Sequence, residues 1–129
     1  MALTAIPNDQ LAEALRDGEK ASGSELLVLS SSKDARIRES LAARTDAPVS
    51  VLILLAQDSK SSVRKALAAN PAVAVANSVL GLLATDKDTD VVLALVENEA
   101  TPAATLRTLL DHGKKNVRAA AEARLVAAF

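Results

Sequence analysis

Apolar and polar residues follow one another along this chain in a pattern that recurs four times. Residues 36–43 read RIRESLAA, and residues 62–69 read SVRKALAA, with the same apolar positions. Residues 90–97 (DVVLALVE) and 116–123 (NVRAAAEA) repeat the pattern less strictly. The aligned apolar residues Ile37, Val63, Val91 and Val117 are 26, 28 and 26 residues apart. Self-similarity at such a period predicts a stack of repeated structural units.

Each repeat contains two segments whose apolar residues have helical spacing. The first segment carries leucines three residues apart and the second carries apolar residues four apart, so each pair lies on one helical face. The leucine pairs are Leu26 and Leu29, Leu52 and Leu55, Leu80 and Leu83, and Leu106 and Leu109. The pairs in the second segment are Ile37 and Leu41, Val63 and Leu67, Val91 and Leu95, and Val117 and Ala121. We therefore expect an all-α fold of about four two-helix repeats, with a core that includes Leu41, Leu55, Leu67, Leu83 and Leu95.

The residues between these segments predict where helices begin and end. The second helices can be capped by Asp34, by Ser61 or Ser62, and by Asp88 or Asp90. The expected repeats cover about residues 24–48, 49–74, 75–102 and 103–129 of a single domain, 1–129. Residues 8–17 have the apolar spacing of a lone second helix, which predicts an N-terminal capping helix. In the last repeat, polar Arg107 and Thr108 suit the outer face that a terminal repeat needs.

The sharpest repeat carries a family resemblance. It reads Val63-Arg64-x-Ala66-Leu67-Ala68-x-Asn70-Pro71, follows a leucine-rich stretch and has Asp58 five residues before the valine. This pattern resembles the leucine-rich repeat variant family, which is related in shape to HEAT and armadillo repeats. The resemblance covers about residues 24–129 and implies a right-handed α-α superhelix, or solenoid. Its arginine column holds at Arg38, Arg64 and Arg118 and fails at Val92.

Composition narrows the function. The formal net charge of −1 supplies no overall basic surface for nucleic acid, and Phe129 is the only aromatic residue. The absence of cysteine excludes disulfides and the cysteine-ligated iron–sulfur module of some family members. No apolar stretch reaches the roughly 18 residues needed to span a bilayer. The sequence therefore predicts a cytoplasmic protein that does not interact with membranes.

Two features of the sequence could indicate a metal site or a catalytic residue, and each has a simpler explanation. Asp86, Asp88, Asp90 and Glu97 have the spacing of a calcium-binding EF-hand loop, but Val91 stands where that loop needs glycine. Acidic residues just before a helix stabilise its dipole, so we expect no metal site here. His112, the only histidine, has no neighbouring nucleophile or second ligand in the sequence. We expect neither catalytic residues nor a cofactor, and therefore no enzyme.

The arginine column has two interpretations. Arg38, Arg64 and Arg118 recur at one helical position and would form a row that can bind phosphates or acidic peptides. Alternatively, each arginine pairs with a loop acid of its own or the next repeat, and Asp58 is placed for this role. The structural interpretation is favoured because repeat-defining residues generally maintain repeat geometry.

The third repeat departs from the other repeats on one side. Val92, Leu93 and Val96 occupy columns that hold polar or small residues in the first two repeats. Either this repeat packs differently, or the three side chains form an exposed apolar patch for a partner or for self-association. Together with the three arginines, they form the candidate partner surface.

The expected function is that of a non-enzymatic scaffold that binds a protein or peptide, self-association included. The warrant is analogy with helical-repeat proteins, whose second helices line a concave binding face. The alternative is a HEAT-like module that binds or processes nucleic acid. The neutral charge and the near-absence of stacking aromatics oppose it, and a basic concave face would favour it.

Overall fold

The structure is a computed structural model, and it describes residues 22–127. The α-helices of this part are α2 (Gly23–Leu29), α3 (Ala35–Ala42), α4 (Val49–Ala56), α5 (Ser61–Ala68), α6 (Asn77–Ala84), α7 (Thr89–Glu97), α8 (Ala103–Leu109) and α9 (Lys115–Ala127). A short 3₁₀ helix, η2 (Pro71–Val75), precedes α6. No strand occurs between residues 22 and 127, so the predicted all-α fold is confirmed for this part. The predicted capping helix at residues 8–17 lies outside the described residues.

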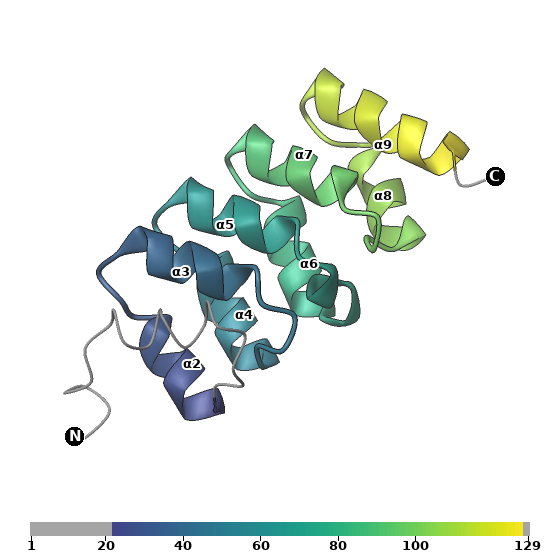
Figure 1. Ribbon diagram of the computed structural model, residues 1–129. Helices are drawn as coiled ribbons and strands as arrows, with labels where there is room; N and C mark the ends of the chain where they lie inside the picture. The colour runs from purple at the N-terminus through teal and green to yellow at the C-terminus, as the bar shows by residue number, and fades with distance from the viewer. Residues whose placement is uncertain (1–21, 128–129) are drawn as a thin grey trace.

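The helices are arranged in two rows (Figure 1). In one row α3, α5, α7 and α9 lie side by side, each packed against the next. In the other row α6 packs against both α4 and α8. Within each pair, the first helix packs against the second, as α4 does against α5 and α8 against α9. Each sequence repeat therefore corresponds to one pair of helices that spans both rows.

The leucine columns form the core between the two rows. Leu41, Leu67 and Leu95 of the second helices are fully buried, as are Leu55 and Leu83 of the first helices. All five predicted core positions are thereby confirmed. Burying an aliphatic side chain of this size stabilises the fold by about 1.5–3 kcal/mol, so these columns supply much of the stability.

The predicted caps are correct where an aspartate stands before the helix. The Asp34 carboxylate accepts the backbone N–H of Arg36, and the Asp88 carboxylate accepts that of Asp90. The serine caps predicted for α5 are wrong, because Ser61 is the first helical residue and Lys60 occupies the cap position. The Lys60 N–H bonds the Asp58 carboxylate instead, over 2.9 Å. The start of α5 is therefore fixed by a residue outside the helix.

The hydrophobic core consists of two clusters, and the boundary between them lies at α7 in the third repeat. One buried cluster extends from α2 to α7, and a second contains Val92 and Val96 of α7 together with apolar residues of α8 and α9. The residues from α8 and α9 are Leu106, Leu109, Val117 and Ala121. Across residues 22–127, no helix has the length and apolar character needed to cross a membrane.

Candidate functional site

The arginine column links consecutive repeats through buried ion pairs. The Arg38 guanidinium on α3 donates to both Asp58 carboxylate oxygens, over 2.7 and 3.3 Å, across the boundary to the second repeat. Its remaining terminal nitrogen donates to the carbonyl of Ser32 in its own repeat. Only 12% of the Arg38 side chain and 7% of the Asp58 side chain are exposed. Arg38 is therefore committed to holding two repeats together.

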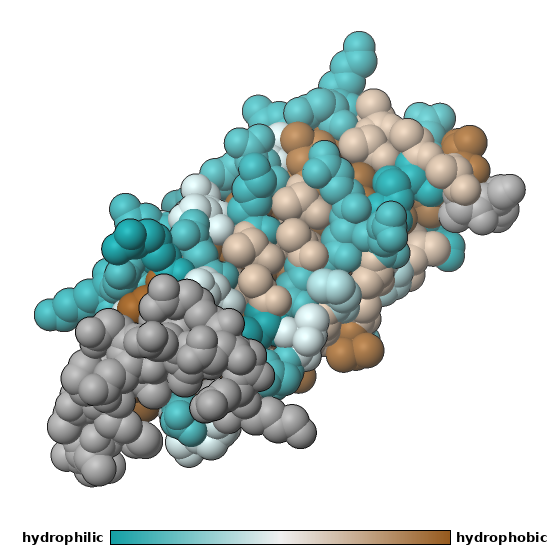
Figure 2. Space-filling view, in the orientation of Figure 1, coloured by the Kyte–Doolittle hydropathy of each residue, from teal (hydrophilic) through white to brown (hydrophobic). Residues whose placement is uncertain are grey.

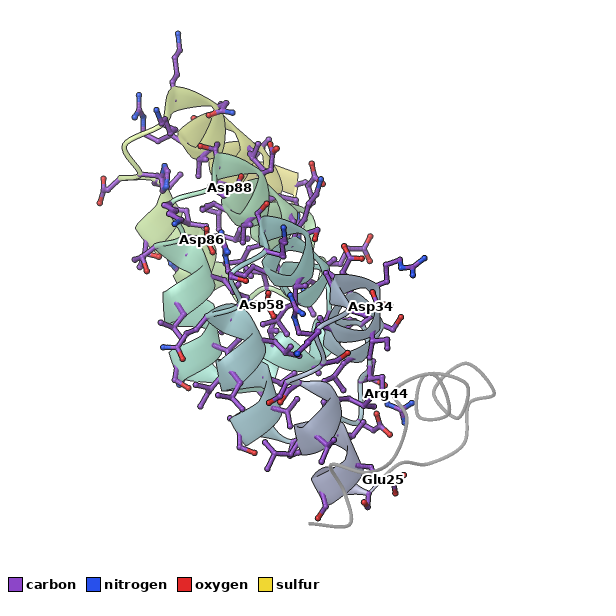
Figure 3. The ribbon with its side chains drawn as sticks, turned by 90° about the vertical axis from the view of Figure 1, so that its left-hand side faces the viewer. Glu25, Asp34, Arg44, Asp58, Asp86 and Asp88 are labelled. Carbon is purple, nitrogen blue, oxygen red and sulfur yellow. The ribbon has the colours of Figure 1, made fainter. Side chains whose placement is uncertain are left out.

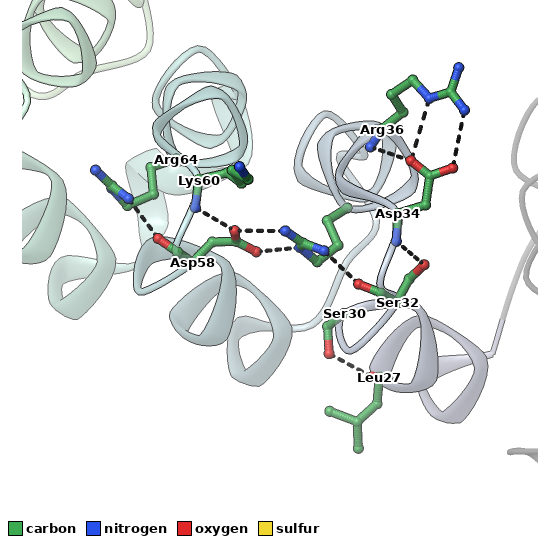
Figure 4. A network of polar contacts seen from close by, with 9 residues as sticks. Leu27, Ser30, Ser32, Asp34, Arg36, Asp58, Lys60 and Arg64 are labelled. Atoms are coloured by element: carbon green, nitrogen blue, oxygen red, sulfur yellow. Dashed lines mark hydrogen bonds and ion pairs between the residues drawn. The ribbon is translucent and has the colours of Figure 1, made fainter.

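Arg64 repeats this geometry one layer further on, at the boundary between the second and third repeats. The arginine–aspartate pairs thus form a ladder that links one repeat to the next. Arg64 donates to both Asp86 carboxylate oxygens over 2.7 and 3.3 Å and to the Asp58 carbonyl over 2.6 Å. Asp58 serves both layers, because its carboxylate accepts from Arg38 and its carbonyl accepts from Arg64. Figure 4 shows Asp58 with its contacts to Lys60 and Arg64. The structural interpretation of the arginine column is confirmed at these two positions. As surface for an external ligand, Arg38 and Arg64 were predicted wrongly.

The loop residues that contact the arginines also fix the turn in which they lie. Ser32, Asp58, Asp86 and His112 each accept the backbone N–H of the residue two positions later, over 2.9–3.2 Å. Asp58, Asp86 and Asp88 follow one another along the side of the molecule where these loops lie (Figure 3). At His112 the acceptor is Nδ1, so imidazole replaces carboxylate in the same turn. The only histidine therefore has a local structural role.

The acidic residues before α7 are occupied in the same way. Asp86 pairs with Arg64, and Asp88 caps α7. In the described part of the chain, no group of three or more His, Cys, Asp or Glu side chains is arranged to hold a metal ion. Asp86 and Asp88 therefore each have a structural contact, an ion pair for Asp86 and a helix cap for Asp88, that accounts for their presence before α7.

The predicted apolar patch on α7 is wrong for two of its three residues. Val92 is fully buried and Val96 is 1% exposed, both in the cluster with α8 and α9. Leu93 is half-buried and packs against the same cluster. The reason is geometric: these two columns of the second helices face the following repeat. Arg64 and Ala68, which occupy the same columns on α5, are buried in the same way. Val92 fills apolar space at the boundary where no arginine–aspartate pair forms.

Arg118 is the last member of the arginine column. Its guanidinium donates to the His112 carbonyl over 2.7 Å, as Arg64 does to the carbonyl six residues before it. It lies on α9, the last helix among the described residues. This position remains half-buried and is not part of the groove described below.

A second ladder, which was not predicted, runs along the ends of the second helices. Asn70 Nδ2 donates to the carbonyls of Ala42 and Arg44 over 2.9 and 2.7 Å. Asn98 Nδ2 donates to the equivalent carbonyls of Ala68 and Asn70 over 2.9 and 3.0 Å. One layer further, Arg124 donates to the carbonyls of Val96 and Asn98. The signal was present in the sequence, because residues 44, 70, 98 and 124 are separated by the repeat offsets.

A groove crosses the row of second helices. It has a volume of about 980 Å³ and is lined by residues of α3, α5 and α7 and of the loops that follow α5 and α7. Its floor is made of small side chains, namely Ala66, Ala69, Ala94 and Ala100. The space-filling view shows weakly apolar surface in the middle of this side of the molecule, between hydrophilic side chains (Figure 2). The groove is therefore a shallow apolar channel with a polar rim.

The charged side chains of the groove are predominantly acidic. The groove is lined by three glutamates, namely Glu39 on α3, Glu97 at the end of α7 and Glu99 in the next loop, and by one cation, Lys65 on α5, which gives a net charge of −2. Within residues 22–127, no hydrogen bond or ion pair engages any of these four side chains. This differs from the arginine column, whose internal members are paired and buried.

The loop that carries Glu99 is held in place by its neighbours. The Asn98 carboxamide oxygen accepts the Ala100 N–H over 3.0 Å, while the same side chain bonds the preceding repeat. The Thr101 hydroxyl donates to the Leu95 carbonyl over 2.6 Å and is buried. One wall of the groove is thus preorganised. Sequence reasoning missed this site because it needs three helices brought together.

No protein-family model, curated protein or solved structure matches this chain.

Proposed function

We propose that this chain is a non-enzymatic scaffold that binds a protein or peptide partner in the groove across α3, α5 and α7. In this proposal the two helix rows form a right-handed α-α solenoid of the kind implied by the leucine-rich repeat variant resemblance, and the protein works in the cytoplasm. The groove carries the proposal: it is a channel of about 980 Å³ with an alanine floor and four charged side chains that make no hydrogen bond or ion pair within residues 22–127. Apolar surface with a polar rim is the usual composition of a protein-binding surface.

Nucleic acid is the weaker candidate ligand. A phosphate backbone is attracted by arranged lysines and arginines. The groove presents one lysine against three glutamates, and both internal arginines of the ladder are paired with aspartates. The charges on this face therefore favour a polypeptide partner.

Blocking the groove tests the proposal. Ala69→Trp places a large side chain in the groove, at an exposed C-cap position whose right-handed helical backbone conformation tryptophan can adopt. Ala43→Trp is a matched control, because Ala43 is the exposed residue in the same backbone conformation one repeat earlier and does not line the groove. The full chain and both variants are used for affinity capture from the native cell, after circular dichroism has shown equal helicity.

We expect a protein retained by the wild type and Ala43→Trp and lost with Ala69→Trp. Equal retention by all three would show that the groove is not the binding surface. Retained RNA or DNA, lost on nuclease treatment, would favour the nucleic-acid alternative.

A further inference from the structure

The groove's charges are arranged in a definite order along its length. Because α5 lies between α3 and α7, Lys65 stands between Glu39 on one side and Glu97 with Glu99 on the other. The order is acidic, basic, acidic. Any ligand that crosses all three helices encounters these charges in sequence.

The length of the groove sets the length of the ligand. Packed helices are about 8–10 Å apart, so the distance from α3 to α7 is about 16–20 Å. An extended peptide rises about 3.3 Å per residue and covers that distance in about five or six residues. Alanine side chains on the floor allow the main chain of such a peptide to approach the helices closely.

Helix direction adds to the negative potential at one end. Glu97 is the last residue of α7, and Ala69 caps the C-terminal end of α5. The C-terminal end of a helix carries partial negative charge and favours a cation. At the end of α7 the Arg124 guanidinium donates to the carbonyls of Val96 and Asn98, and its positive charge offsets the partial negative charge of that helix end. A ligand cation would therefore be attracted at this end by Glu97, by Glu99 and by the C-terminal end of α5.

We infer that the groove takes an extended peptide segment with two basic residues about five or six positions apart and no cation between them. One basic side chain pairs with Glu39 and the other with Glu97 and Glu99, while Lys65 receives a carbonyl or carboxylate of the central part. The Lys65 ammonium disfavours a continuous basic run, so the specificity is for spaced cations. This inference rests on the proposed function and adds the chemistry of the partner.

Selection from a random nonapeptide display library tests this inference, with the full-length chain as the target. Peptides bound by wild type and by Ala43→Trp, but not by Ala69→Trp, are sequenced and synthesised. We expect them to carry lysine or arginine at two positions with the stated spacing. Their affinity should fall by about twofold to fivefold for each of Glu39→Gln and Glu97→Gln, the range for one exposed ion pair, and should weaken as salt is raised.

Two variants control for net charge and for the order of charges. Glu122→Gln removes one negative charge from the exposed surface of α9, outside the groove, and should leave the affinity unchanged. Lys65→Glu should shift the selected peptides to a third, central basic residue. Groove-dependent peptides without basic residues would overturn this inference and leave the proposed function standing. Selection of no peptide that distinguishes Ala69→Trp from Ala43→Trp would overturn both.

Discussion

Removing one member of a buried ion pair should cost this protein a large part of its stability. Arg64 joins the second and third repeats, and its side chain and that of Asp86 are 8% and 5% exposed. Arg64→Met keeps an unbranched apolar stem while removing the guanidinium with its charge and its three hydrogen bonds. The Asp86 carboxylate then stays buried with the Asp88 N–H, at 2.9 Å, as its remaining donor.

The expected loss is about 3–5 kcal/mol, the cost of leaving one charge of a buried pair uncompensated. The free energy of unfolding of a typical domain is about 5–15 kcal/mol, so the variant should be close to the limit of folding. Arg64→Met combined with Asp86→Asn removes the stranded charge and keeps an acceptor for the Asp88 N–H. That double variant should be more stable than Arg64→Met alone, by about 1–3 kcal/mol.

Urea denaturation followed by circular dichroism measures these differences. Arg36→Met is the matched control, because it removes the same charge from an ion pair whose arginine side chain is 88% exposed. Exposed pairs add little, so its midpoint should stay close to that of the wild type. If Arg64→Met costs no more than Arg36→Met, or if the double variant is no more stable than Arg64→Met, the ladder does not hold the repeats together.

Further predictions concern the core, the second ladder, the helix caps and metal binding. Leu67→Ala should destabilise the fold by about 2–5 kcal/mol, and an unchanged denaturation midpoint would show that the core register is wrong. Asn98→Ala should cost about 1–3 kcal/mol in the same assay, because two buried carbonyls of the preceding repeat lose their donor. The Asp34 carboxyl accepts hydrogen bonds from the Arg36 side chain and backbone, which lower its pKa below the usual 3.8. Its contribution should therefore be complete above that pH and be lost as the pH falls through the lower, folded-state pKa. Unfolding curves of wild type and Asp34→Asn should converge in acid, and a constant difference would contradict this. Titration calorimetry should detect no specific calcium binding, whereas micromolar binding abolished by Asp88→Ala would contradict the role of that residue as a helix cap.

The leucine columns could be read from the sequence because they obey one simple rule. A residue such as Leu67, buried between two rows of helices, recurs with the period of the repeat and with helical spacing. Caps by aspartate are equally local, since Asp34 bonds an N–H two residues away. Features that depend on one helix and its immediate neighbours in the chain were therefore predictable.

Features that join different repeats were predicted less well. The sequence places Asp58 near Arg64, yet its carboxylate pairs with Arg38 and only its carbonyl contacts Arg64. The column of Val92 looked solvated because arginine is generally a surface residue, whereas here arginine lies at the boundary between repeats. Which face of a helix meets the next repeat depends on how the pairs stack, and a linear pattern does not contain that information.

The groove could not be predicted for the same reason. Its charged residues come from three helices and a loop, and none of them stands out in its own repeat. Glu39 and Lys65 occupy one column and have opposite charges, so they suggest no common role. Only the packing of α3, α5 and α7 places them around one channel.

The most direct test of the central claim is an NMR titration of the ¹⁵N-labelled full-length chain with a selected basic nonapeptide. If the groove is the binding surface, the amide signals that shift should be those of Ala66, Ala69, Glu97 and Glu99, while Ala43 stays unchanged. Shifts confined to exposed apolar residues of the other row, such as Leu54 on α4, would place binding on the opposite helices and contradict the account.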